Sequence, residues 1–163
     1  MAVMNGIYQR FPVTNIGDRN KAEEEKTPQP NSSSSMGNSN AYQQYQQNMI
    51  NTATPQELTL MLYNGLVKFL KLSIQSIEEK NMEKANNYII RSQDIIMEFM
   101  CTLDMQYEVS KSLMSLYDYM NRRLVDANTK KEKAIVEEVL GFAEELRDTW
   151  AQAMKLAKQA VNK

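Results

Sequence analysis

The sequence predicts an all-α protein, an antiparallel up-down four-helix bundle with a short N-terminal helical arm or cap. All four prolines lie within the first 55 of the 163 residues, and the only glycines after them are Gly65 and Gly141. Proline breaks helix interiors and glycine weakens them, so the long stretch that avoids both favours helices. Within that stretch apolar residues recur at spacings of three and four, the period of one helix face.

The chain divides into two predicted parts, a disordered extension over residues 1–40 and a helical bundle over residues 41–163. A low-complexity run at Thr27–Ser35 carries prolines and serines with little to bury. The one apolar patch before it is Gly6–Pro12. We favour a tail that contacts nothing over a segment that docks on a groove of the same protein, because single short motifs often occur by chance.

The first long helix has the strongest start signal in the chain. Thr54 suits the N-cap, Pro55 the first helical position, and Glu57 the third position of a capping box. This helix is predicted to end at about Glu79, and its wide apolar arc indicates a central place with neighbours on more than one side. Before it, the polar segment Tyr42–Ile50 predicts either a short helix or an extended arm.

The second helix is predicted from an N-cap at Asn81 to about Leu103, and the third from about Tyr107 to Asn128. Their apolar spacing predicts the inner positions, with Tyr117 flanking the core of the third helix. The predicted core residues are Ala85, Ile89, Ile96, Phe99 and Leu103 of the second helix, and Val109, Leu113, Leu116, Met120, Leu124 and Ala127 of the third.

The fourth helix is predicted to begin near Thr129 and to continue close to the chain end. Its apolar positions alternate by four and three, which is typical of bundle or coiled-coil packing. Because the connections are short, consecutive helices are expected to be antiparallel neighbours. These predicted core positions are Ile135, Val139, Phe142, Leu146, Trp150, Ala153, Ala157 and Ala160.

Composition argues against an enzyme. The chain has no histidine and one cysteine, Cys101, so it holds no imidazole base and no zinc cluster, and we expect no catalytic residue, metal or cofactor. Cys101 is expected to be a small buried hydrophobe, and the acidic pairs of the fourth helix a solvated face. A net charge of −1 argues against nucleic-acid binding. With no transmembrane span and no secretory signal in view, we expect a soluble cytoplasmic protein without membrane insertion.

Binding is the function that the composition favours. The 12 methionines and 8 tyrosines are numerous for this length. Methionine adapts to varied apolar partners, and tyrosine combines contact area with a polar tip, so a groove that receives an amphipathic helix is expected. Two alternatives stay open: a homo-oligomeric scaffold that uses this surface for self-association, and, far behind, an enzyme with a carboxylate-bound metal.

Three segments resemble the flagellar export chaperones for flagellin, the FliS family. They are the arm Tyr42–Asn48 with the following Thr52–Gly65, the stretch Leu116–Asn128, and the stretch Leu146–Met154. The resemblance covers about Ala41 to Lys155. It implies a cytosolic chaperone that binds the disordered C-terminal segment of flagellin, prevents premature polymerisation and aids delivery to the flagellar type III export apparatus. A component of the export gate is the second implied partner, and a homodimer of the free protein stays open.

The resemblance also implies candidate flagellin-binding residues at the matching positions. On the arm these are expected to lie over the groove, and the arm of the family can occupy the groove when no client is bound. Gly65 is expected to allow the close approach of another backbone, since glycine weakens a helix. The candidates are Tyr42, Tyr45 and Ile50 of the arm, Leu58, Met61, Leu62 and Gly65 of the first helix, and Tyr117, Met120 and Arg123 of the third. The region 1–36 departs from the family pattern.

Overall fold

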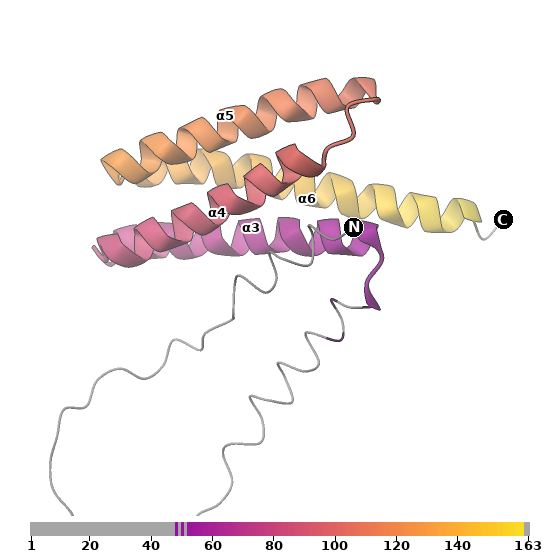
Figure 1. The fold of residues 1–163 in the computed structure, drawn as a ribbon. Helices are drawn as coiled ribbons and strands as arrows, with labels where there is room; N and C mark the ends of the chain where they lie inside the picture. The colour runs from indigo at the N-terminus through magenta and orange to yellow at the C-terminus, as the bar shows by residue number, and fades with distance from the viewer. Residues whose placement is uncertain (1–47, 49, 51, 162–163) are drawn as a thin grey trace, which may run out of the picture. The chain divides into compact units, whose positions relative to one another are not determined.

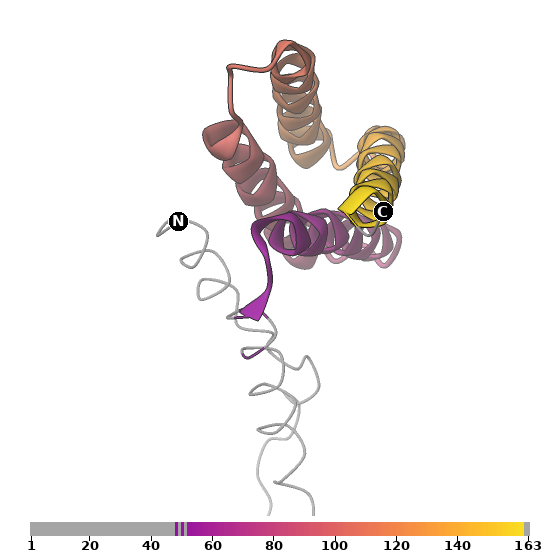
Figure 2. The same cartoon turned by 90° about the vertical axis from the view of Figure 1, so that its right-hand side faces the viewer.

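The bundle consists of four long helices, as predicted. In the computed structural model the described residues are Asn48, Ile50 and 52–161, and the predicted disordered region 1–40 and the arm residues Tyr42 and Tyr45 lie outside them. The helices are α3 (Pro55–Glu78), α4 (Met82–Thr102), α5 (Glu108–Lys130) and α6 (Lys133–Val161). Consecutive helices run in opposite directions (Figure 1), and each packs against the next, with α6 returning to α3 and closing a ring (Figure 2).

Both predicted helix starts with side-chain caps are confirmed. The Thr54 hydroxyl oxygen accepts from the Glu57 amide at 3.3 Å, and the Thr54 amide donates to Glu57 Oε2 at 3.0 Å, which completes the capping box. At α4 the Asn81 side chain accepts from the Lys84 amide at 3.1 Å. These bonds satisfy amides that a helix start leaves without partners, so each cap fixes the residue at which its helix begins.

The boundary between the last two helices differs from the prediction. A start near Thr129 is wrong, because α5 continues to Lys130 and α6 begins at Lys133. The break falls at Lys131, whose φ of 54° is left-handed and whose ammonium group donates to Asn128 Oδ1. Glycine is the usual residue in that conformation. Because the residue at this position is a lysine, the sequence contains no local signal for the turn.

The core of the bundle lies along its axis and contains a pair of buried hydroxyl groups. Tyr63 of α3 and Tyr117 of α5 meet across the diagonal of the ring, with their hydroxyl oxygens 2.6 Å apart. The ring of Phe99 lies against both, at centroid distances of 4.4 Å and 5.4 Å. The largest fully buried apolar side chains are Leu66, Leu70, Ile89, Ile96, Met120, Leu124, Val136 and Val139.

One end of the bundle is open, and several predicted core positions there are wrong. Figure 1 shows α5 and α6 diverging toward the C-terminal end of α6. Val109, at the start of α5, is 63% exposed, and Ala153, Ala157 and Ala160 of α6 are exposed. The apolar alternation of α6 therefore continues past the last residue that its neighbours cover. The prediction that Cys101 is buried is also wrong, because this thiol is exposed.

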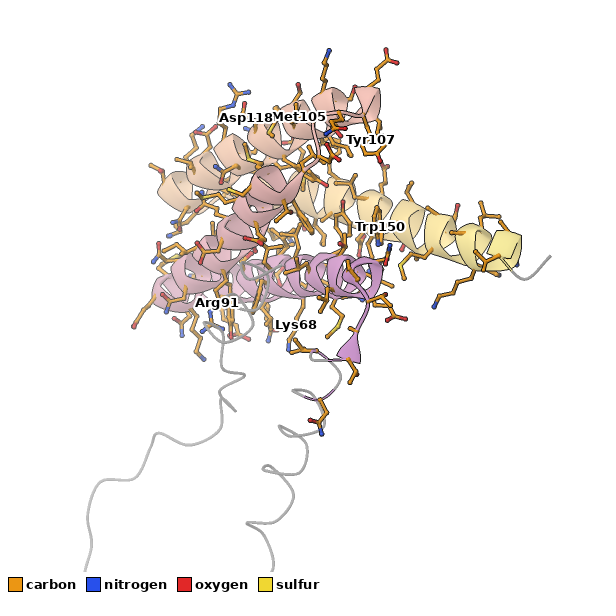
Figure 3. The ribbon with its side chains drawn as sticks, turned by 45° about the vertical axis from the view of Figure 1, so that its right-hand side comes forward. Lys68, Arg91, Met105, Tyr107, Asp118 and Trp150 are labelled. Atoms are coloured by element: carbon orange, nitrogen blue, oxygen red, sulfur yellow. The ribbon has the colours of Figure 1, made fainter. Side chains whose placement is uncertain are left out.

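Contacts of Trp150 join α6 to the start of α3 (Figure 3). Its indole Nε1 donates to the Gln56 carbonyl oxygen at 3.0 Å, and its ring lies 6.5 Å from that of Tyr63. This bond gives a hydrogen-bond partner to the indole N–H of a half-buried aromatic side chain. Trp150 thus closes the ring of helices at the end where α5 and α6 separate.

Candidate functional site

The candidate residues of α3 lie together on the flank that faces α4. Leu58, Met61 and Gly65 are half-buried, and Leu62 beside them is buried. They are spaced by three and four residues, so they share one side of the helix. We call this surface the α3–α4 face. It consists of Leu58, Met61, Leu62 and Gly65 of α3 with Ile95 and Glu98 of α4.

Pairwise contacts fix the register of α4 along this face. The rings of Phe69 and Tyr88 stack at 6.2 Å, and the Arg91 guanidinium lies 5.5 Å from the centre of the Phe69 ring. One turn or more further along, Ile95 lies opposite Gly65, and then Phe99 lies opposite Tyr63. The antiparallel register therefore places Glu98 level with residues 62–64, next to Leu62 on this face.

Gly65 does not mark a close approach of another backbone among the described residues. A Cβ atom built at this position would have one described atom within 4 Å, the Cδ1 of Ile95 at 3.5 Å. That separation is ordinary van der Waals contact, so the expected backbone approach is not found there. The missing side chain instead leaves bare α3 backbone beside Ile95, and we call this position, which lies between Met61 and Phe69 on the helix, the Gly65 notch.

Positive charge lies at one end of the same side of the bundle. Lys68 of α3 is exposed and Arg91 of α4 is half-buried, and Figure 3 shows both on the outer side of these two helices. The Arg91 guanidinium stacks over Phe69, which holds it at the surface. The face is thus apolar in its middle and basic at the end near Arg91.

Sequence reasoning missed Glu98, the acidic residue of this face. Its side chain is buried, with 6% exposure, and its Oε1 has no hydrogen-bond partner. Burial raises the pKa of this carboxyl group. The signal in the sequence is an acid three residues after Ile95, on the flank of an otherwise apolar helix face.

The α5 candidates lie elsewhere. Tyr117 and Met120 are buried in the core, where Tyr117 is bonded to Tyr63. Desolvation raises the pKa of Tyr117 far above its ordinary value, and the Tyr63 hydroxyl adds to the effect. Arg123 lies on the α5–α6 side, so the structure does not bring these three residues to the α3–α4 face.

Arg123 links α5 to α6 through Glu138. Its Nε and its NH2 donate to Glu138 Oε2 at 3.0 Å and 2.5 Å, and the Tyr119 hydroxyl donates to Glu138 Oε1 at 2.5 Å. The bonds from Arg123, and then the bond from Tyr119, lower the pKa of Glu138. The guanidinium of Arg123 is thus bound to the Glu138 carboxylate, and this pair holds α5 and α6 in position relative to each other.

Of the arm, the structure describes Asn48, Ile50 and Thr52, which are helical. Ile50 is half-buried, and the Thr52 hydroxyl donates to the Asn48 carbonyl oxygen at 2.8 Å. A helical end of the arm therefore precedes the capping box of α3.

A second hollow lies between α3 and the last turns of α6, and sequence reasoning missed it as well. Its volume is about 350 Å³. Its rim is basic, and Lys158 there lies 3.4 Å from Glu57 Oε1. The lining residues are Leu60, Ala151, Met154, Lys155, Lys158 and Gln159.

In the described part of the chain, no group of three or more His, Cys, Asp or Glu side chains is placed to hold a metal ion. Among the same residues, no helix is both long and apolar enough to cross a membrane.

Comparison with known proteins identifies the family. The model of the family described as flagellar protein FliS matches residues 38–157, most of the chain. The chain belongs to the FliS family. FliS proteins are chaperones and not enzymes, which agrees with the prediction from composition.

Curated FliS relatives are similar to this chain over about seven tenths of its length. The flagellar secretion chaperone FliS of Bacillus subtilis is 50% identical over 116 residues, which cover 71% of this chain and 87% of the relative. The FliS of Campylobacter jejuni is 29% identical, and the match covers 72% of this chain and 93% of the relative. The predicted family and its chaperone role are thereby confirmed.

A solved structure supports the fold. The chain is similar to a structure described as the crystal structure of a flagellar chaperone from bacteria, with a TM-score of 0.59 and 19% identity. The match covers 71% of this chain and 96% of that one. At this identity the likeness bears on the helical architecture alone.

Proposed function

We propose that this FliS protein is a cytoplasmic chaperone that binds the disordered C-terminal segment of flagellin, prevents its premature polymerisation and delivers it to the export gate of the flagellar type III apparatus. The observation that carries the proposal is the 50% identity to a flagellar secretion chaperone over 116 residues. The composition of the bundle fits a client that is apolar and folds on binding.

We further propose that the α3–α4 face receives the client. Leu58, Met61 and Gly65 offer half-buried apolar surface there, and the notch at Gly65 lets an incoming helix approach α3 closely. Tyr117 and Met120 support this face from the core and do not touch the client. Tyr42, Tyr45 and Ile50 of the arm remain candidates for covering the face in the free protein, and residues 1–40 are proposed to be a tail outside the bundle.

Titration with a fluorescently labelled peptide tests the client. The peptide is the C-terminal segment of the flagellin of the same organism, and binding is followed by anisotropy and far-UV circular dichroism. We expect saturable binding with a gain of helix. The absence of binding would exclude the C-terminal segment as client, and self-association measured by light scattering would then favour a scaffold. A complex with purified export-gate protein only when the peptide is bound would support delivery.

A matched pair of glycine variants tests the place of binding. Gly65→Ala fits beside Ile95 and is expected to raise the free energy of unfolding by about 0.5–1 kcal/mol, because alanine favours the helix. It fills the notch, so the peptide should bind about tenfold more weakly. Gly141→Ala is the control, because nothing described lies within 4 Å of its Cβ.

For this pair of glycine variants, stability and binding are measured on the same samples. The control should stabilise α6 by a similar amount and leave peptide affinity unchanged. Equal affinity for both variants would show that the client does not pack against the Gly65 notch.

A further inference from the structure

Glu98 is a buried acidic residue of α4. Its side chain is 6% exposed, and Oε1 has no hydrogen-bond partner. Among the described residues it is the only buried side-chain nitrogen or oxygen atom in this condition. Burying a carboxylate oxygen without a hydrogen-bond partner lowers the stability of the fold. Such an oxygen is therefore expected chiefly where another molecule, such as a ligand or a partner protein, supplies the hydrogen bond.

The register of α4 places this carboxyl group on the α3–α4 face. Ile95 lies opposite Gly65, and Phe99 lies opposite Tyr63, so Glu98 is level with residues 62–64, of which Leu62 belongs to this face. Ile95 and Glu98 are three residues apart and therefore neighbours on one side of α4. A segment packed on Met61 and over the Gly65 notch would pass Glu98.

Other charges along the face do not neutralise Glu98. Arg91 precedes it by seven residues, about 10 Å along the helix axis, and is stacked on Phe69. Lys68 of α3 is exposed at that same end, and Asp94 is an acid one turn from Glu98. Desolvation is the single cause of the raised pKa of Glu98, so no charged neighbour contributes to it.

We propose that Glu98 is a specificity-determining residue of the α3–α4 face, and that its carboxylate accepts a hydrogen-bonded ion pair from a lysine or arginine side chain of the client segment. This inference rests on the proposed function, because it names what the client must carry. A cation is the chemistry that best compensates a buried carboxylate, since it supplies both a donor and the opposite charge. The basic end at Lys68 and Arg91 repels the same cation, which favours its placement beside Glu98 and away from that end of the face.

Binding of such a client is coupled to a proton. The pKa of Glu98 is raised in the free protein, and an ion pair in the complex lowers it. The complex therefore holds fewer protons than the free protein, and affinity rises with pH across the interval between the two pKa values. The proton leaves the carboxyl group for solvent, and no other group changes.

The test compares Glu98→Gln with Glu145→Gln in the full-length protein. Glutamine keeps the shape of the side chain and removes its charge, and Glu145 is an exposed carboxylate of α6 that serves as control. We expect Glu98→Gln to bind the flagellin C-terminal peptide roughly 10- to 100-fold more weakly, because a hydrogen bond to a charged group is lost. Glu145→Gln should bind as the wild type does.

Peptide variants identify the cation. Each lysine and arginine of the peptide is replaced singly by glutamine, and each peptide is titrated into wild-type protein and Glu98→Gln. One replacement should weaken binding to the wild type while leaving binding to Glu98→Gln unchanged. That non-additivity is the signature of a direct pair.

Calorimetry in two buffers of different ionisation enthalpy supplies a second readout. Wild-type protein should release protons on binding at pH values between the pKa of Glu98 in the complex and its raised pKa in the free protein, and Glu98→Gln should not. Wild-type affinity in Glu98→Gln, or additive effects of every peptide replacement, would overturn the role of Glu98 while leaving flagellin as the client. Failure of the wild type and of Glu145→Gln to bind the peptide would overturn both the client and the ion pair.

Discussion

At the scale of single residues, the buried pair of Tyr63 and Tyr117 shows how two polar atoms can depend on each other. Their hydroxyl groups are 2.6 Å apart in the core, and each satisfies the other. Removing one hydroxyl leaves its partner buried and unpaired, whereas removing both leaves neither. The pair also joins α3 to α5, the two helices that are diagonal in the ring.

Tyr63→Phe and Tyr117→Phe are each expected to lower the free energy of unfolding by about 1–3 kcal/mol. The double variant is expected to lose less than the sum of the two single losses. Urea denaturation of the four proteins measures this coupling. Additive losses would contradict the mutual dependence of the two hydroxyl groups.

For single residues, burial was predicted well where apolar residues recur at a clear helical period. It was predicted poorly where burial depends on contact with a residue that is distant in the sequence. Met120 and Leu124 are buried as predicted. Tyr117 was expected to flank the core, and its burial depends on the distant Tyr63, which no local pattern reveals. The exposure of Cys101 was misjudged and the burial of Glu98 was missed for the same reason. The exposure of a residue on the side of a helix depends on whether a neighbouring helix covers that side.

At the scale of helices and turns, the polar capping residues predicted where helices begin. The residues at which helices end were predicted less accurately. The capping box at Thr54 and the cap at Asn81 are local, so they could be predicted from four adjacent residues. The end of α5 depends on a left-handed lysine, Lys131. A lysine in the turn carries no such local signal, so the end of α5 was predicted two residues early.

The turn between α3 and α4 contains a second left-handed lysine, Lys80, with a φ of 57°. Its amide donates to the Ile77 carbonyl oxygen at 3.0 Å, as in a helix C-terminal cap. Lys80→Gly is expected to raise the free energy of unfolding by about 1 kcal/mol, because glycine adopts this conformation without strain.

Thermal and urea unfolding measure the effect, and Lys111→Gly at an exposed position of α5 is the control. The control substitution should lower the free energy of unfolding by about 1 kcal/mol, since glycine weakens a helix interior. Destabilisation by both substitutions would show that the backbone strain at Lys80 is negligible.

The side chains in the last turns of α6 are largely exposed. Leu156 is 66% exposed and Val161 is 86% exposed. Truncation after Lys155 is therefore expected to change the free energy of unfolding by less than about 1 kcal/mol, because little buried surface is lost. The ion pair of Lys158 with Glu57 is exposed and contributes little.

Truncation after Thr149 is the contrasting variant for α6. It removes Trp150, its bond to Gln56 and its contact with Tyr63, so a much larger loss of stability is expected. Equal effects of the two truncations on the urea midpoint would mean that the exposed turns contribute to the bundle.

At the scale of the whole molecule, the ring of four antiparallel helices followed from the sequence, but the extent of each interface did not. An apolar alternation predicts the face that a helix turns inward. It does not predict where the neighbouring helix ends, and the exposure of Val109 and Ala153 is the result. Likewise the matching motifs named client-binding candidates on two helices, while the packing separates Arg123 from Met61.

The response of the bundle to acid should reflect two carboxyl groups with opposite shifts. The pKa of Glu138 is lowered by its bonds from Arg123 and Tyr119, so its contribution to stability is present above its unfolded pKa and is lost as pH falls through its folded pKa. The pKa of Glu98 is raised by burial, so its contribution is present at low pH and is lost as pH rises through its folded pKa.

Urea denaturation at a series of pH values between about 2 and 7 tests this pair of carboxyl groups. Glu138→Gln is expected to flatten the loss of stability at acid pH, and Glu98→Gln is expected to increase stability at neutral pH relative to the wild type. Parallel pH profiles for the wild type and both variants would contradict the assignments. Glu145→Gln serves as the exposed control.

The ring arrangement also bears on how the chain reaches its native state. Three of the four helix interfaces join helices that follow one another in the sequence, and the fourth, between α3 and α6, closes the ring. Contacts between sequence neighbours form with a small loop-closure cost, so such topologies fold quickly. We expect α3, α4 and α5 to assemble during synthesis and the indole of Trp150 to dock on Gln56 last. Trp150 fluorescence in stopped-flow refolding would then report the completion of the bundle.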